Sequence, residues 1–250
     1  MLYSINHFLI KKGEVMNNSD YSMENGVSRF MYQVYGWMTI GLSVTAGLSY
    51  YLSSTPSFVQ TIFNHPMLLI GLFIAQLALV ISLSAFVMRM SYATALACFL
   101  FYASTVSITL TPIFLVYTLG SIYLTFLITA GMFGAMCLYG YFTRADLTSI
   151  GSMCTMALFG LILAMLVNIF FKSEAMSYII SAIGVVIFTL LTAYDAQKIK
   201  QIAQQLHFRQ LAVGHEATQN KIAILGALTL YLDFLNLFLF LLNFMGNKRD

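Results

Sequence analysis

The sequence predicts an all-α integral membrane protein, built as a bundle of seven transmembrane helices. Of its 250 residues, 60% are hydrophobic and only 8% are charged, whereas a soluble domain has about 25% charged residues. The mean hydropathy is +0.83. Apolar stretches of about 20 residues, the length that a helix needs to cross a bilayer, recur along the chain. Short connections join most of them, so consecutive helices are expected to be antiparallel neighbours.

Residues 1–28 are expected to form a flexible cytoplasmic arm. Lys11, Lys12 and Glu14 interrupt the early apolar run, so no cleavable signal peptide is expected. The transmembrane domain is predicted to cover residues 29–246. Its spans are predicted at residues 30–52, 67–88, 92–111, 119–142, 147–171, 178–199 and 222–244.

Prolines and charged residues set the breaks between these spans. In chain order they are Pro56 with Pro66, Arg89, Pro112, Arg144 with Asp146, and Lys172 with Glu174. The polar stretch QIAQQLHFRQ, expected to be helical, separates the last two spans. In the first span, Gly36, Gly41 and Gly47 form a small-residue face that lets another helix approach closely.

The distribution of Lys and Arg predicts the orientation, because cytoplasmic connections carry the excess of these residues. With the N-terminus inside, nine basic residues fall in inner segments: Lys11, Lys12, Arg29, Arg89, Arg144, Lys198, Lys200, Arg209 and Lys221. Three fall in outer segments: Lys172, Lys248 and Arg249. We therefore expect a multi-pass protein of the plasma membrane, with a cytoplasmic N-terminus and an outer C-terminus.

Asp233 lies near the middle of the last span, where a carboxylate is costly. The cost is roughly 2.5–3.5 kcal/mol on insertion scales, so this side chain is not expected to face lipid. It either makes a structural polar contact with neighbouring helices or belongs to a site that binds ions or protons. Asp195, near the inner end of the sixth span, is the only other acid on a span; three residues before Lys198, it also fits an ordinary interfacial residue.

The two acids can meet only if the sixth helix continues beyond the lipid boundary or the helices tilt. If they meet in a dry setting, Asp195 and Asp233 cannot both ionise cheaply, so the pair would share a proton. Arg89, at the same face of the membrane, would hold the ionised form by a charge-assisted hydrogen bond that protonation weakens. The carboxylate oxygens are also suitable ligands for a calcium ion in transit.

Two stretches resemble a known family. GALTLYLDFLNLFLFLL (226–242) and LTAYDAQKI (191–199) resemble the two C-terminal signatures of the Bax inhibitor-1 family, also called the transmembrane BAX inhibitor motif family. The length, the seven spans and the arginine turn after the second span fit a bacterial-type member as well. The resemblance covers nearly all of residues 25–245.

The resemblance implies a bundle with the last helix near its centre and a pH-sensitive calcium leak gated by a paired aspartate. Matched motif to motif, Asp195 and Asp233 would be that pair, and Arg89 would be the latch by its place in the chain. Bacterial members often carry a glutamate within the second span, where this chain offers only Gln76. The residues expected to support the pair are Tyr194, Tyr231, Asn236 and Gln76.

Two other classes remain open. An intramembrane aspartyl protease also uses aspartates on consecutive spans, and Tyr194–Asp195 matches half of its pattern. The other half, Gly-x-Gly-Asp, is replaced by Leu-Tyr-Leu-Asp at 230–233, and no later Pro-Ala-Leu segment follows. The third class is a non-transporting partner of a membrane quality-control protease, for which the glycine-rich helix faces would provide contacts.

The composition excludes several further functions. The net charge of +3 is too small and scattered to suggest nucleic-acid binding. Cys98, Cys137 and Cys154 lie in apolar stretches without a CxxC, and the four histidines lack metal-ligand spacing, so no disulfide framework or zinc site is expected. Phosphate-binding loops and nucleophile elbows are missing. We therefore expect neither an enzyme nor a cofactor, and the expected partners are the lipid bilayer, calcium ions and protons.

Overall fold

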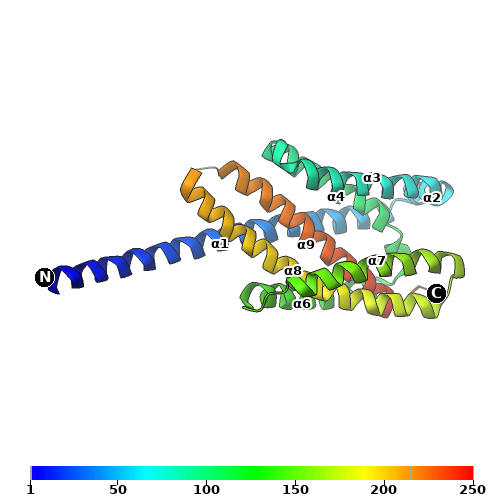
Figure 1. Cartoon of the computed structure of the whole chain (residues 1–250). Helices are drawn as coiled ribbons and strands as arrows, with labels where there is room; N and C mark the ends of the chain where they lie inside the picture. Colours follow the sequence, from blue (N-terminus) through cyan, green and yellow to red (C-terminus); the bar gives the residue numbers. More distant parts are fainter. Residues whose placement is uncertain (1, 214–215, 250) are drawn as a thin grey trace.

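The computed structural model describes residues 2–213 and 216–249, with side chains at all of these except 2–22, 62–63, 66, 207–213 and 216–217. Along this described part the chain is helical with no β-strand, which confirms the all-α class. The helices are α1 (Leu2–Ser53), α2 (Pro56–Asn64), α3 (Pro66–Phe86), the 3-10 helix η1 (Val87–Arg89), α4 (Tyr92–Leu110), α5 (Ile113–Val116), α6 (Leu119–Phe142), α7 (Thr148–Phe171), α8 (Glu174–Val213) and α9 (Glu216–Met245). Figure 1 shows them as a bundle with α1 extending beyond it.

Helix α1 continues without a break from Leu2 into the bundle. The first proline of the chain is Pro56, so no residue before it removes a backbone N–H or restricts φ in the way that ends a helix. From Val27 onward one face of α1 is buried, with Phe30, Val34 and Met38 at helical spacing.

Six of the described helices are long and apolar enough to cross a membrane: Met67–Arg89, Tyr92–Val116, Leu119–Phe142, Thr148–Phe171, Glu174–Leu206 and Thr218–Met245. They agree closely with the last six predicted spans. The first predicted span, 30–52, lies in α1 but is not among the six, since polar residues such as Gln33, Thr39 and Ser43 interrupt it. The count of seven therefore stays a prediction.

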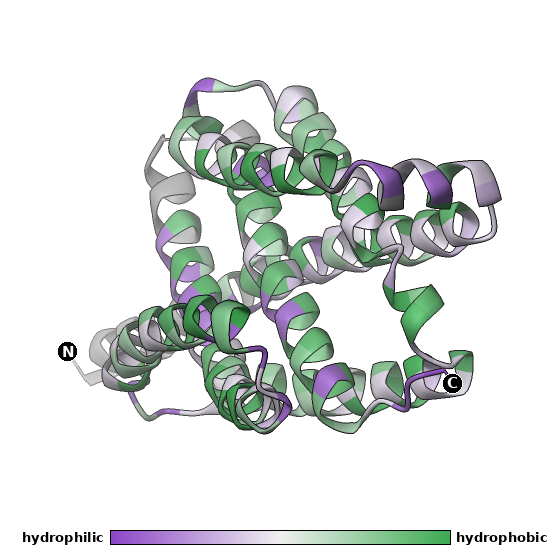
Figure 2. Cartoon of the chain, turned by 90° about the vertical axis from the view of Figure 1, so that its right-hand side faces the viewer, coloured by the Kyte–Doolittle hydropathy of each residue, from purple (hydrophilic) through white to green (hydrophobic). Residues whose placement is uncertain are grey.

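The outward faces of the helices are apolar, as a bilayer requires. On α7, for example, Phe159 is 67% exposed and Phe170 is 86% exposed. Figure 2 shows apolar residues on the outside of the bundle as well as between its helices. Large exposed apolar surfaces are rare on soluble monomers, so this chain places them against lipid.

Helix α9 lies near the centre of the bundle, as the resemblance implies. Of its most apolar stretch 67% is buried, against 11% for α3 and for α7. It contacts α8, α1, α6 and α4 and passes between them (Figure 1). An acid on α9 is therefore surrounded by protein, which resolves why Asp233 is tolerated at mid-helix.

The two ends of the bundle are closed by different contacts. At one end, the Lys221 ammonium at the start of the buried part of α9 donates to the carbonyls of Met88 and Met90, at 3.2 and 3.0 Å. At the other end, the backbone N–H of Thr118 donates to the Asn247 carbonyl, and that of Arg249 donates to the Val116 carbonyl. Helix α9 thus runs from the end with the α3–α4 turn to the end with the C-terminus (Figure 1).

Candidate ion and proton site

Helices α8 and α9 pack as an antiparallel pair whose register decides which residues face each other. Three pairs of residues in contact fix this register: Ser181 with Asn243, Gly184 with Phe240, and Ile199 with Gly226. The Asn243 amide donates to the Ser181 hydroxyl at 2.7 Å. Asp195 and Asp233 lie between the second and third pairs, one on each helix, so this register sets them opposite each other.

The carboxyl groups of Asp195 and Asp233 contact each other within hydrogen-bonding reach. Asp233 is only 5% exposed, whereas Asp195 is half-buried. Oxygen Oδ2 of Asp233 is buried and has no hydrogen-bond partner among the described residues. Two carboxyls can hydrogen-bond only when one of them carries a proton, so the geometry is that of a pair able to hold a proton. The role of this pair as an ion and proton site stays a prediction.

Helix α8 continues far past the predicted end of its span, and this satisfies the condition under which the acids can meet. The apolar pattern ends near Ile199, but the helix runs on to Val213. Asp195 therefore sits inside a continuous helix, held on both sides, instead of at a frayed end.

Close packing against α6 and α7 holds α8 at the residues around Asp195. A Cβ atom at Gly140 of α6 would collide with the carbonyl oxygen of Ala193, and one at Gly151 of α7 would lie 2.5 Å from the Tyr194 ring. Only glycine permits these two approaches. The residues directly before Asp195 are thereby fixed from two sides.

Polar contacts fix the residues directly after Asp195. The Gln197 side chain accepts from the Leu147 backbone N–H at 2.9 Å and donates to the Ala145 carbonyl at 2.7 Å. The Lys200 ammonium donates to the Tyr141 carbonyl at 2.6 Å. These bonds satisfy backbone groups of the α6–α7 turn and join it to α8.

The same turn carries an exposed acid, Asp146, that accepts a hydrogen bond from the backbone. Thr148 donates from its hydroxyl and from its N–H to Oδ1 of Asp146, and these bonds hold the pKa of Asp146 below its ordinary value of 3.8. The sequence places this acid in a turn, and the structure gives it a local role at the start of α7.

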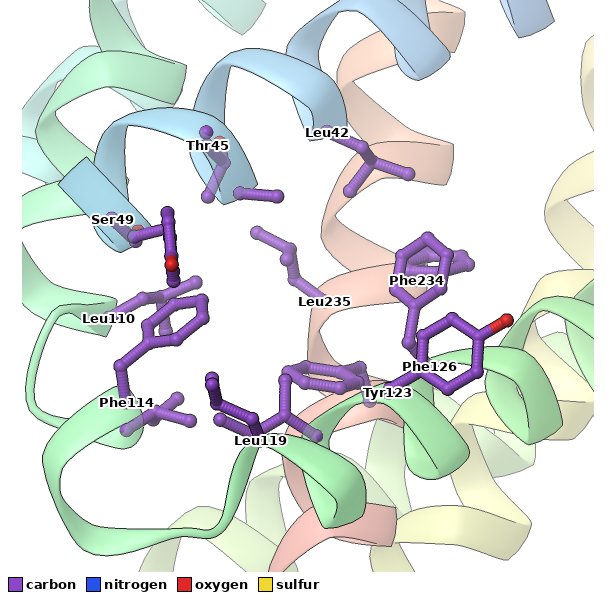
Figure 3. Close-up of a pocket in the computed structure, with 16 residues that line it drawn as sticks. Leu42, Thr45, Ser49, Leu110, Phe114, Leu119, Tyr123, Phe126, Phe234 and Leu235 are labelled. Carbon is purple, nitrogen blue, oxygen red and sulfur yellow. The ribbon is translucent and has the colours of Figure 1, made fainter.

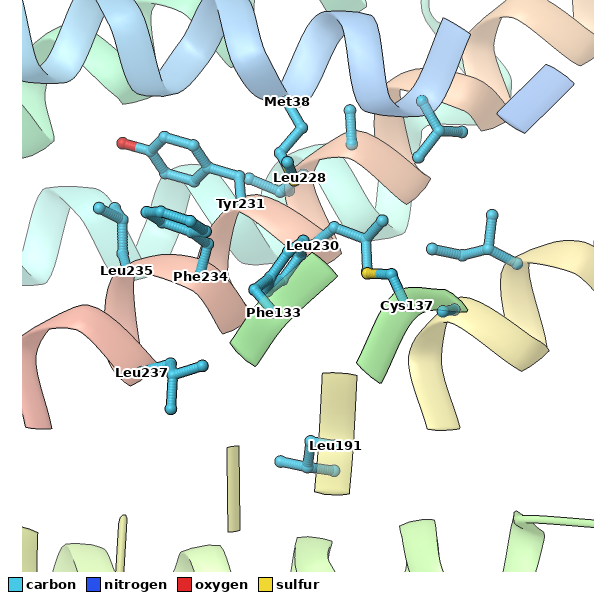
Figure 4. Close-up of a cluster of buried hydrophobic side chains, with 14 of the residues drawn as sticks. Met38, Phe133, Cys137, Leu191, Leu228, Leu230, Tyr231, Phe234, Leu235 and Leu237 are labelled. Atoms are coloured by element: carbon cyan, nitrogen blue, oxygen red, sulfur yellow. The ribbon is translucent and has the colours of Figure 1, made fainter. Parts of the chain in front are cut away.

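On the other side of the pair, aromatic and hydroxyl contacts position α9. The Tyr231 hydroxyl is 2.7 Å from Oγ1 of Thr45, which donates to the Ala103 carbonyl at 3.1 Å. The Tyr231 ring packs edge-on against Phe99, at 5.8 Å between ring centres. Phe234 packs edge-on against Phe133 of α6. Figure 4 shows Tyr231, Phe234 and Phe133 in this buried cluster.

A thiol lies close to the buried acid. Cys137 of α6 is near Asp233 and shares a hydrogen bond with the hydroxyl of Tyr35. Figure 4 shows the Cys137 side chain reaching toward α9 in the buried cluster. The surroundings of Asp233 therefore come from α1, α6 and α8 together.

A cavity of about 220 Å³ opens beside Asp195. It lies on the Lys198 side of the pair, toward the end of the bundle with the α3–α4 turn. The residues that line it are Phe30, Ser84, Asp195, Lys198, Ile199, Ile202, Ile222, Leu225, Gly226 and Thr229. The positive charge that acts on Asp195 is that of Lys198, three residues along the same helix.

The other residues expected at the site lie elsewhere. Arg89 is exposed on η1, at the same end of the bundle as the cavity. The Gln76 amide donates to the Thr109 hydroxyl at 3.3 Å and joins α3 to α4. The Asn236 amide donates to the Leu232 carbonyl of its own helix at 2.8 Å. Tyr194 packs over Gly151, and Tyr231 packs toward α1 and α4, as described above.

Several functional neighbours were not singled out from the sequence. From the sequence, Lys198 is counted only among the basic residues of the inner segments, although its i, i+3 spacing from Asp195 is the signal that puts both on one helix face. Gln197, Gly140 and Cys137 carry no comparable signal, because their roles depend on contacts between distant segments.

The pair alone does not provide a full calcium shell. Calcium takes six to eight oxygen ligands. Among the described side chains, no third acid, histidine or cysteine forms a metal-holding group with the pair.

Comparison with known proteins finds relatives that match most of the chain. The chain matches the family model described as "Inhibitor of apoptosis-promoting Bax1" over residues 27–250. It is 49% identical to the inner membrane protein YbhL of Escherichia coli K12, over 90% of this chain and 94% of that protein. It is 42% identical to an uncharacterized protein of Borreliella burgdorferi (89% and 94% covered) and 39% identical to the uncharacterized protein RP147 of Rickettsia prowazekii (92% and 94% covered).

Proposed function

The chain belongs to the Bax inhibitor-1 family, and on this premise we propose that it is a pH-sensitive cation leak channel of the inner membrane, with calcium as the expected ion. The observation that carries the proposal is the contact between the Asp195 and Asp233 carboxyls in the middle of the α8–α9 interface. Such an arrangement is unnecessary for packing, because an apolar pair of similar size would avoid the cost of burying charge.

Proton sharing gives the pair two charge states. With one proton between them, Asp195 and Asp233 carry a single negative charge that attracts a cation. A second proton removes that charge, and with it the attraction of Lys198 for the pair. The protons belong to the pair and not to either residue. Acid is thereby expected to weaken the contacts that hold α8 and α9 together at this level.

The cavity beside Asp195 provides access from one side only. From the other side, Phe240 fills the interface by packing on Gly184 and stacking on Phe188 at 5.7 Å between ring centres. A polar group follows beyond it, where Asn243 bonds Ser181. In this conformation Phe240 fills the α8–α9 interface on that side of the pair, so we expect Phe240 to move for ions to pass between these two helices.

We prefer transport to peptide hydrolysis. Paired aspartates also serve aspartyl proteases, but the residues before Asp233 are Leu-Tyr-Leu instead of Gly-x-Gly. A non-transporting partner of a membrane protease would not require the two acids to meet. It is the outcome to accept if the purified protein conducts no ions.

The test is calcium and monovalent-cation flux through the purified protein in liposomes, at neutral and acid pH. Wild type is expected to leak more at acid pH. Asp195→Asn and Asp233→Asn should each abolish that pH dependence, and the double variant should add little, because members of one network are not additive. Asp146→Asn, which changes an exposed acid outside the spans, is the matched control and should keep it.

Two results contradict different parts of the proposal. Folded wild-type protein without flux at either pH would reject the channel. Flux in which Asp195→Asn and Asp233→Asn keep the wild-type pH dependence would reject the pair as its gate and leave Asp233 as a packing contact.

A further inference from the structure

A second cavity, larger than the one at Asp195, lies in the half of the bundle toward the C-terminus. Its volume is about 560 Å³, within the range of about 300–1,000 Å³ that holds a small-molecule ligand. Figure 3 shows its walls: the last turns of the bundle part of α1, the α4–α5 corner, the first turns of α6, and α9 behind. Leucine, phenylalanine and tyrosine side chains provide most of the lining.

The lining offers a ligand nothing but hydrocarbon contacts in its interior. No charged residue is among the described residues that line it. The Thr45 hydroxyl is already bonded to Ala103 and Tyr231, and the Ser49 hydroxyl donates to the Ser107 carbonyl at 2.8 Å. A polar ligand would therefore lose its hydrogen bonds to water without gaining others, which costs several kcal/mol per group.

The mouth of the cavity faces the bilayer and not water. Leu119, Tyr123 and Phe126 at its edge are 48%, 66% and 40% exposed, on a helix that spans the membrane by length and composition. Tyr50, also at the edge, packs edge-on against Phe114. A lipid whose headgroup lies at the interface would meet tyrosines at the rim first and apolar residues farther inside.

We propose that this cavity binds one acyl chain of a phospholipid, which enters sideways from the leaflet on the C-terminal side. Hydrocarbon is the medium at its mouth, its walls are mostly apolar, and the Thr45 and Ser49 hydroxyls inside it are already bonded to the protein. The proposal concerns binding alone and does not depend on any ion flux.

The bound chain would lie against the helical turn that follows Asp233. Phe234 and Leu235 form part of the cavity wall, directly after the acid in the chain. Thr45, on the opposite wall, holds the Tyr231 hydroxyl. An acyl chain in this cavity therefore contacts α9 itself, at Phe234 and Leu235, and also Thr45 of α1, which holds α9 through Tyr231.

Quenching of tryptophan fluorescence by phospholipids with brominated acyl chains tests the proposal. The chain has a single tryptophan, Trp37, so Trp37→Phe gives a silent background. In it, Phe238→Trp places a reporter in the cavity wall, with Ile122→Trp as a second reporter if the first does not fold. Phe99→Trp is the buried control outside the cavity, and Phe159→Trp is the lipid-facing control.

In brominated phosphatidylcholine vesicles, Phe238→Trp should be quenched like Phe159→Trp although Phe238 is only 8% exposed, while Phe99→Trp should keep its emission.

A bulky residue at Gly47 should then displace the acyl chain, because a Cβ there meets nothing within 4 Å and Gly47 lines the cavity. Gly47→Phe is expected to abolish the quenching of the cavity reporter. Gly36→Phe, at an equally open position of the same helix outside the cavity, should leave it unchanged.

Two outcomes would overturn the proposal. The first is full emission from both cavity reporters in vesicles that quench Phe159→Trp, which would mean that no acyl chain enters. The second is equal quenching with Gly47→Phe and with Gly36→Phe, which would place the quencher outside the cavity.

Discussion

Lys198 follows Asp195 by three residues, so the two side chains share one face of α8. Its ammonium acts on the Asp195 carboxyl, lines the same cavity and lies 5.6 Å from the centre of the Tyr194 ring. Arg89, the residue expected as the latch, is exposed on η1. We therefore propose Lys198, the positive charge that acts on Asp195, rather than the exposed Arg89, as the cation that holds the ionised pair in this conformation.

A comparison of the two cations follows from this placement. Lys198→Gln should move the pH profile of flux toward neutral pH, because the ionised pair loses its nearest positive charge. The shift should be small, up to roughly half a pH unit, because exposed ion pairs contribute about 0.2–1 kcal/mol. Arg89→Gln should shift the profile less. Flux recorded across a pH series in liposomes measures both, and a larger shift with Arg89→Gln would return the latch to Arg89.

At the scale of the helices, α8 and its apolar run end at different residues. The predicted sixth span stops near Ile199, where Lys198 and Lys200 interrupt the apolar run. The helix continues because Gln, Ala and Leu in the following QIAQQL stretch favour helix in water as well as in lipid. Hydropathy therefore predicts where the lipid ends, and the end of a helix needs a separate signal.

The contact between α6 and α8 predicts a sharp difference between two glycines of α6. Gly140→Leu should destabilise the protein by about 3 kcal/mol or more, the upper end for overpacking, because its side chain would collide with the Ala193 backbone, which cannot move aside. Gly134→Leu on the same helix meets nothing within 4 Å and should fold normally. Thermal unfolding in detergent measures the difference, and equal stability of the two variants would show that α6 and α8 are not in close contact near Asp195.

Across the whole molecule, the parts that the sequence predicts are those encoded within one segment. Apolar runs predict six of the membrane helices to within about five residues at most ends, although α8 continues well past its predicted span. The cost of burying Asp233 identifies this residue without a structure. The register that brings Asp195 to it depends on contacts such as Ser181 with Asn243 and Gly184 with Phe240, whose members lie about 60 residues apart in the chain. The lipid-facing cavity joins four separate segments, so no local pattern could indicate it.

The orientation in the membrane is the property of the whole chain that remains to be measured. Nine basic residues are predicted inside and three outside. The arrangement of the helices keeps two of the predicted inner residues apart from two of the predicted outer ones. Arg89 and Lys221 lie at one end of α9, and Lys248 and Arg249 lie at the other, beside the α5–α6 connection. Since positive residues are retained on the cytoplasmic side, the end with Arg89 is expected inside and the C-terminus outside.

Paired reporters after Asp250 and at about residue 210 test this orientation. Alkaline phosphatase, which is active only outside, should be active after Asp250 and inactive at residue 210, and green fluorescent protein should give the opposite pattern. A linker is needed after Asp250, because the backbone of Arg249 is bonded to Val116. Fluorescence at both positions would mean that α9 does not cross the membrane. In that case Asp233 would be reached from the cytoplasm alone, and the two-sided path that a leak channel needs would be absent.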